Sequence, residues 1–188
     1  MKKLLSILAT LVMFLMGCAT SKVTIQDNVF VSEGSPNIRV KVDAAFVPQP
    51  VWKWEGIIKG GDAAGTRYET SYLFLPSQKS VDRAVFILFS DLDTTSKNFW
   101  RNAGDGTDKD IDGTTMRVMF SEIYKVAPGL VRDFTAKGRT FSTLYSSIWF
   151  KKIVNPQRML HIGYIETAVG QSTADLEKRA REAFKIQQ

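Results

Sequence analysis

Cysteine and histidine are almost absent from this chain of 188 residues, which contains one of each, Cys18 and His161. A lone cysteine excludes an intramolecular disulfide and a CxxC site, and a lone histidine excludes any two-histidine metal site. The sequence also lacks the G-x-S-x-G, H-E-x-x-H and P-loop patterns of hydrolases, zinc proteases and nucleotide-binding proteins. The chain is therefore predicted to carry no metal centre and no cofactor.

A hydrophobic run long enough to span a membrane is missing as well. Leu4 to Met16 carries no charge but has only 13 residues, whereas a transmembrane helix needs about 20. Lys2 and Lys3 precede this run. A short basic region followed by a short apolar region is the arrangement of a secretory signal peptide.

The residues that follow the apolar run are Leu15, Met16, Gly17 and Cys18. This stretch resembles the lipobox of bacterial lipoproteins. The resemblance implies that residues 1–17 are a signal peptide cleaved before Cys18, which then carries diacylglycerol on its sulfur and an acyl chain on its amino group. Each buried CH₂ contributes about 0.8 kcal/mol, so two or three chains anchor a protein durably. The rest of the chain resembles no functionally characterised family.

Ala19 would be the second residue of the processed chain. In the lipoproteins that this chain resembles, the lack of aspartate at that position favours transfer to the outer membrane, facing the periplasm. Processing removes two lysines and no acidic residue, which lowers the formal net charge from +6 to +4. The remaining basic residues are scattered, and no nucleic-acid partner is expected.

The processed chain has the length of one domain with a sizeable core. Residues 18–27 are predicted to form the lipidated N-terminus and a short polar tether, and residues 28–188 a single domain. Apolar residues alternate with polar ones from Asn37 to Phe46, which is the period of a half-buried strand. Further strands are predicted over Val51–Ile58, Thr66–Leu75 and Arg83–Phe89, and a hairpin over Thr140–Val154 and Arg158–Thr167.

The segment from Ser172 onward changes to a helical period. Ser172 and Asp175 have the spacing of a capping box, and Leu176, Ala180, Ala183 and Phe184 share one helical stripe. Met116 to Phe134 fits either a helix or a strand. The predicted fold class is α+β: an antiparallel sheet of about six strands, with helices mainly on one face and a C-terminal amphipathic helix.

The stretch TDKDIDG places Asp108, Asp110 and Asp112 at the first, third and fifth positions of a calcium-loop pattern, with Gly113 sixth. The twelfth position, which needs a bidentate glutamate, is Met119. We interpret the stretch as an acidic turn, with a weak calcium loop as the alternative.

His161 lies in a predicted strand, on the same face as Met159, Gly163 and Ile165. It is predicted to be structural, with a catalytic base as the alternative. Trp52 and Trp54 alternate on one strand and therefore share a face, where they are predicted to be core, with an exposed stacking platform for sugars or peptide as the alternative.

Together these features predict a non-enzymatic, lipid-anchored envelope protein that binds a partner protein or envelope component. The alternatives are a hydrolase that uses the aspartate carboxylates, and a binder of a small ligand in a cavity between sheet and helix.

Overall fold

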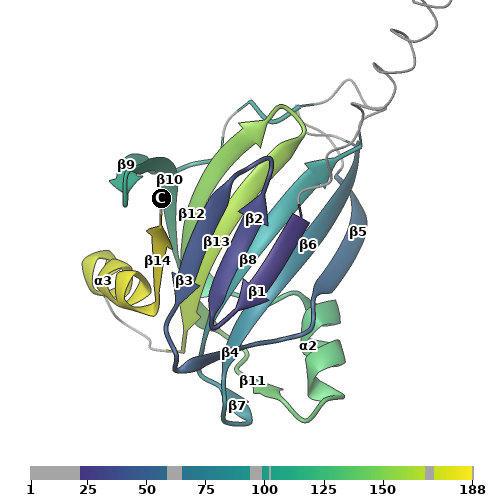
Figure 1. Ribbon diagram of the computed structural model, residues 1–188. Coiled ribbons are helices and arrows are strands. Elements are labelled where there is room, and N and C mark those ends of the chain that lie inside the picture. The colour runs from purple at the N-terminus through teal and green to yellow at the C-terminus, as the bar shows by residue number, and fades with distance from the viewer. Residues whose placement is uncertain (1–21, 59–64, 94–98, 102, 168–171, 188) are drawn as a thin grey trace, which may run out of the picture.

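The computed structural model describes residues 22–58, 65–93, 99–101, 103–167 and 172–187. The predicted signal peptide and lipobox, including Leu15, Met16, Gly17 and Cys18, lie outside the described residues. Strands dominate the described part, and they form a sandwich in which a small sheet covers one face of a large one (Figure 1). No helix in the described part is long and apolar enough to cross a membrane.

The large sheet has eight strands, all paired antiparallel. Its order is β4–β6–β8–β13–β12–β10–β9, and β5 pairs with β6 on the side where β4 also lies. The predicted hairpin around Asn155, Pro156 and Gln157 is confirmed as β12–β13. The strands are β4 (Phe46–Pro48), β5 (Trp52–Ile58), β6 (Gly65–Pro76), β8 (Arg83–Leu92), β9 (Thr107–Ile111), β10 (Thr114–Tyr124), β12 (Tyr145–Asn155) and β13 (Arg158–Glu166).

The small sheet has four strands in the order β1–β2–β3–β14, again antiparallel. Its strands are β1 (Lys22–Gln26), β2 (Val29–Glu33), β3 (Ile38–Val42) and β14 (Phe184–Gln187). Strand β1 contains residues that the sequence analysis assigned to the tether. A separate parallel pair joins β7 (Ser80–Val81) to β11 (Thr140–Phe141), and the two described helices are α2 (Pro128–Thr135) and α3 (Thr173–Ala183).

The α+β prediction with about six strands is wrong, because the described chain folds as a mostly β protein with twelve strands in its two main sheets. Three segments account for the difference. Residues 22–33 form a hairpin, the ambiguous segment from Met116 continues as strand β10 to Tyr124, and helix α3 is not terminal. Phe184 and Ile186 alternate into the core as part of β14, so the helical stripe ends at Ala183.

The main core lies between the two sheets. We call the face of the large sheet that packs on the small sheet the inner face, and the opposite face the outer face. Phe30 and Val40 of the small sheet are fully buried against inner-face residues such as Ile87 and Ile162. A second cluster, around Leu73, lies on the outer face, where α2 covers it with Leu130 and Phe134. Part of the outer face therefore has no helix over it in the described residues.

Candidate functional site

The aspartate stretch forms the β9–β10 hairpin rather than the helix–loop–helix of a calcium hand. Ile111 stands opposite Thr114, which leaves Asp112 and Gly113 as a two-residue turn. Both turn residues have positive φ, 54° and 79°. This is the conformation for which Asp-Gly is favoured in tight hairpins.

The three carboxylates of this hairpin have separate partners. Asp108 Oδ1 lies 2.7 Å from Arg117 Nε, and the Gly113 N–H donates to Asp110 Oδ1 over 2.9 Å. Asp112 pairs with Arg181 of α3 and also accepts a 2.9 Å hydrogen bond from the Ile186 N–H of β14. Within the described ranges, no three His, Cys, Asp or Glu side chains gather as metal ligands. Asp112 thus ties the large sheet to the edge of the small one.

A different polar group lies on the outer face of the large sheet, away from α2. We call it the His161 cluster, and it comprises Arg67, Glu69, Ser90, Lys151 and His161. The register brings these residues together from four adjacent strands: Glu69 of β6 stands opposite Ser90 of β8, and Lys151 of β12 stands opposite His161 of β13. Strand β13 lies between β8 and β12, and His161 stands opposite Leu88, two residues before Ser90, so the two pairs are diagonal neighbours on one face.

Hydrogen bonds within this cluster centre on Glu69. Arg67 Nη2 lies 3.1 Å from Glu69 Oε1, and the Ser90 hydroxyl donates to the same oxygen over 3.5 Å. By contrast, His161 Nε2 and Arg67 Nε are buried without a hydrogen-bond partner among the described residues. A buried polar atom without a hydrogen-bond partner is costly, so each of these two nitrogens calls for an explanation. Ser90 faces Glu69 rather than His161, so the group contains no serine–histidine pair.

Burial controls the protonation of the cluster. Burial, reinforced by the charges of Lys151 and Arg67, lowers the pKa of His161 to about 3. The pKa of Lys151 is also lowered, mainly by burial and then by Arg67, while Asp105 acts in the opposite direction. At neutral pH the imidazole is uncharged, and it is a weak base because its conjugate acid is strong. The cluster then carries two cations and one carboxylate.

Aromatic side chains border the cluster on two sides. The Arg67 guanidinium lies 5.3 Å from the ring centre of Trp54, a cation–π geometry. On the other side, Trp149 contacts His161 edge to face, with 6.4 Å between ring centres, and Tyr124 lies 5.5 Å from Trp149. Burial, and secondarily the charge of Glu69, raises the pKa of Tyr124 to about 12.

The two tryptophans of β5 differ in burial. Trp52 packs against the Leu73 cluster, and its indole N–H donates to Asp133 of α2 over 3.1 Å. The prediction that Trp54 is core is wrong, because 37% of its surface is exposed. Its ring borders solvent at the edge of the sheet and covers Arg67.

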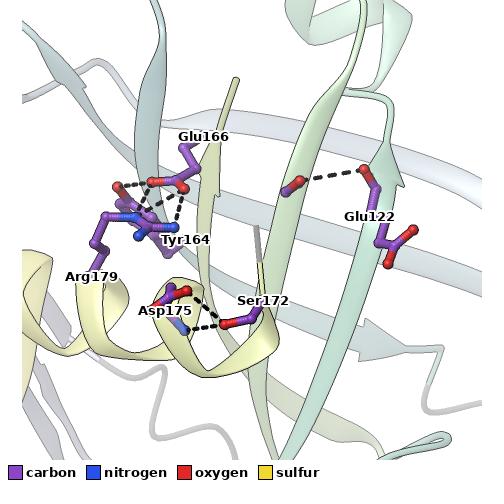
Figure 2. Close-up of polar contacts among 7 residues, drawn as sticks. Glu122, Tyr164, Glu166, Ser172, Asp175 and Arg179 are labelled. Carbon is purple, nitrogen blue, oxygen red and sulfur yellow. Dashed lines mark hydrogen bonds and ion pairs between the residues drawn. The ribbon is translucent and has the colours of Figure 1, made fainter. Parts of the chain in front are cut away.

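A second buried polar network joins α3 to the large sheet (Figure 2). Glu166 of β13 accepts hydrogen bonds from Arg179 Nε at 2.8 and 3.0 Å and from Nη2 at 2.5 Å. The Tyr164 hydroxyl donates to the same carboxylate over 2.8 Å. Ser172 caps α3 by accepting from the Asp175 N–H, as the capping-box spacing predicted. Every member of this network has a partner, so we assign it a structural role.

An open groove of about 720 Å³ lies at the end of the sandwich beside the β1–β2 turn. Asp27 and Asn28 of that turn line it, together with Phe46 and the end of α3 at Glu182. Neither the hairpin aspartates nor the His161 cluster reach it. The Asn28 side chain already donates hydrogen bonds to the carbonyl oxygens of Asp43 and Phe46. We therefore interpret the groove as the space beside a packed turn and not as a binding site.

Sequence reasoning identified His161 and missed its neighbours. Arg67 and Glu69 lie two residues apart on β6 and therefore on the same face, whereas the later residues of the strand are apolar. This change from polar to apolar along one strand was the available signal for a polar surface at its first half. Compared with protein-family models, with curated proteins and with solved structures, the chain shows no match.

Proposed function

We propose that this protein is a lipid-anchored protein of the bacterial cell envelope, facing the periplasm at the outer membrane. Its role is non-enzymatic, and its sandwich domain binds a partner protein or another envelope component. The observation that carries the proposal is the position of Cys18, the chain's single cysteine, directly after Leu15, Met16 and Gly17 at the end of a short apolar run. Tethered binding domains need no more than such an anchor and a recognition surface.

The His161 cluster is the recognition surface that the side chains favour. It combines Arg67, whose side chain is 29% exposed, with the exposed ring of Trp54 at its border, while the unpartnered Nε2 of His161 is buried. Arg67 and Lys151 outweigh Glu69 in charge, so the surface suits a group that offers hydrogen-bond acceptors and negative charge. Aromatic rings beside such a group supply apolar contact area at a small cost in conformational entropy.

The alternative of a carboxylate-based hydrolase has less support. Such chemistry requires two acids in one cleft with well-separated pKa values. Asp108 and Asp112 are each held by an arginine, and Asp110 by the turn backbone. A histidine with a pKa of about 3 is also poorly matched to proton abstraction at neutral pH.

The anchor is tested by labelling cells with radioactive or clickable palmitate. Label should enter the wild-type protein and be absent from Cys18→Ala, whose product should move to the soluble fraction. Conversely, a Cys18→Ala protein that is processed and membrane-bound like wild type would remove the lipoprotein proposal.

The recognition surface is tested by capture of partners with the full lipidated chain from its own membranes. Arg67→Gln should reduce recovery of any specific partner about tenfold or more, because a hydrogen bond to a charged group is worth about 2 kcal/mol. Lys41→Gln is the matched control, because Lys41 is an exposed strand lysine of the small sheet. Equal recovery with both variants would exclude the His161 cluster as the surface.

A further inference from the structure

Strand β5 lies at the margin of the large sheet (Figure 1), and among the described residues one of its edges is unpaired. It pairs with β6 from Trp52 opposite Ser71 to Ile58 opposite Gly65, and none of the other described strands pairs with it. The open edge of a strand presents backbone N–H and C=O groups that can pair with a further strand. With seven residues, β5 is long enough to form such a ladder.

The side chains of β5 are unusually apolar for an open edge. Ile57 is 74% exposed, and Val51, just before the strand, is 47% exposed. Soluble proteins commonly protect an open edge with charges, proline or a bulge. In β5 the only charged residues are Lys53 and Glu55, and they carry opposite signs.

These two charges have no counterpart inside the sheet. Lys53 stands opposite Thr70 and Glu55 stands opposite Tyr68. Both side chains are exposed, and neither forms an ion pair with a described residue. The available cross-strand partners for Lys53 and Glu55 therefore lie on a strand that would pair with the open edge of β5.

We propose that the protein forms a twofold-symmetric dimer through β5, with the β5 strands of two copies paired antiparallel and Trp54 opposite itself. In this register Lys53 of each copy stands opposite Glu55 of the other, so two cross-strand ion pairs form. Val51 then stands opposite Ile57, and two exposed apolar side chains cover each other at both ends. The edges of the two large sheets join into one continuous sheet.

Symmetry leaves few other registers. When a twofold axis runs perpendicular to the sheet, directly opposite residues lie on the same face, so one residue must face its own copy. A register centred on Lys53 or on Glu55 places like charges directly opposite each other, which is destabilising. A register centred on Trp52 or on Gly56 places each charge opposite an uncharged residue or beyond the strand. Trp54 is the centre that matches both charges.

The packing of Trp54 suits this centre. The indole ring lies over Gly56 of its own strand, where a Cβ atom would fall 2.0 Å from the ring. Because paired strands run in opposite directions, the two rings at the axis extend away from each other. Two bulky side chains can therefore occupy opposite positions without collision, and Gly56 keeps the surface beneath each ring flat.

The first test uses charge reversal in the full-length chain, with sedimentation velocity in detergent. Lys53→Glu and Glu55→Lys should each weaken dimerisation about tenfold or more, because two attractive cross-strand pairs become repulsive. The double variant Lys53→Glu/Glu55→Lys restores both pairs and should return to within about threefold of the wild-type Kd. Lys41→Glu, which makes the same charge change in the small sheet, should leave the dimer intact.

The second test uses disulfide trapping in isolated membranes. Residues directly opposite each other have Cα atoms about 4.5–5.5 Å apart, which suits a disulfide, whereas diagonal neighbours are about 7–8 Å apart. Trp54→Cys should therefore yield a covalent dimer on mild oxidation, and Lys53→Cys should yield much less. The lipid anchor is the same in every variant, so association caused by a shared micelle or membrane cannot produce these differences.

A wild-type protein that stays monomeric up to about 100 μM in detergent, with no trapping at residue 54, would overturn the dimer. So would a dimer that is insensitive to both single charge reversals, because it would use another surface. Neither result bears on the lipid anchor or on the His161 cluster, which are tested by palmitate labelling and partner capture. The dimer and the proposed function can therefore fail independently.

Discussion

Substitution of Arg179 by methionine removes the guanidinium that satisfies Glu166 and keeps most of the aliphatic stem. The Glu166 side chain is only 9% exposed, and among the described residues the Tyr164 hydroxyl would be its one remaining hydrogen-bond donor, with Arg83 opposite it on β8. Breaking a buried ion pair by removing one partner costs about 3–5 kcal/mol, whereas exposed pairs contribute about 0–1 kcal/mol. Arg179 is 32% exposed, so we expect a loss of about 2–3 kcal/mol in the free energy of unfolding.

The assay is urea denaturation of the soluble domain from residue 19 onward, followed by tryptophan fluorescence. For a domain of this size the loss corresponds to a decrease in Tm of about 5–10 °C. Arg132→Met is the matched control, because the Arg132 side chain is 81% exposed beside Asp133. Loss of the Arg132 guanidinium should change the free energy of unfolding by less than about 0.5 kcal/mol.

A double-mutant cycle with Glu166→Gln decides whether the effect belongs to the pair. Direct contact predicts a coupling free energy of about 1–3 kcal/mol between positions 166 and 179. A coupling below about 0.5 kcal/mol, or a loss no larger than that of Arg132→Met, would refute the reasoning. Helix α3 would then be held by its apolar face, through Leu176 and Ala180, and by its two other ion pairs, Arg181 with Asp112 and Glu177 with Lys109.

Three further predictions follow from the sheet faces and the hairpin. The folded-state pKa of His161 is about 3, below its ordinary value near 6.5, so the folded state loses stability as pH falls from 6.5 toward 3. The imidazole resonances of this single histidine should show no NMR titration between pH 8 and 5, and a midpoint above 5 would contradict the burial argument. Gly163→Ala should reduce the free energy of unfolding by about 1–3 kcal/mol in urea melts, because the new Cβ would lie 2.4 Å from the Trp149 ring. Gly56→Ala should reduce it less, because the Trp54 ring can move into solvent, and the reverse order would be inconsistent with the packing. Calorimetry on the soluble domain should show no saturable heat below about 100 μM calcium, since Met119 stands where a calcium loop needs a bidentate glutamate. Binding in that range that Asp110→Asn abolishes would mean that a distant carboxylate completes a calcium site.

The strands that alternate cleanly could be predicted from the sequence. Ile38, Val40 and Val42 all point into the core, as their spacing indicates. The segment from Met116 was ambiguous because its apolar residues satisfy both periods. The Asp112-Gly113 turn resolves it, because a tight hairpin requires strands on both sides. Lys22 to Gln26 was missed because its apolar residues, Val23 and Ile25, are few and only half-buried.

The candidate site could not be assembled in the same way. A two-residue turn at Pro156 and Gln157 pairs Asn155 with Arg158, and a regular ladder from there would place Lys152 opposite His161. A register shift between Ile153 and Asn155 places Lys151 opposite His161 instead. No residue pattern in this hairpin predicts a bulge of this kind. Arg67 and Glu69 share the outer face with His161 only because β6, β8 and β13 are consecutive strands of the sheet, and strand order is a property of the whole fold.

The pairing of β14 with β3 sets the time at which the domain can mature. Ile186 stands opposite Val40, so 145 residues separate two residues that are neighbours in the small sheet. Contacts between such distant segments form late, since the entropy of closing a long loop must be offset first. A chain emerging N-terminus first cannot finish its sandwich until residues 184–187 are available. If the chain crosses a membrane before it folds, as the proposed anchor implies, this connectivity delays completion of the sandwich until residues 184–187 have crossed.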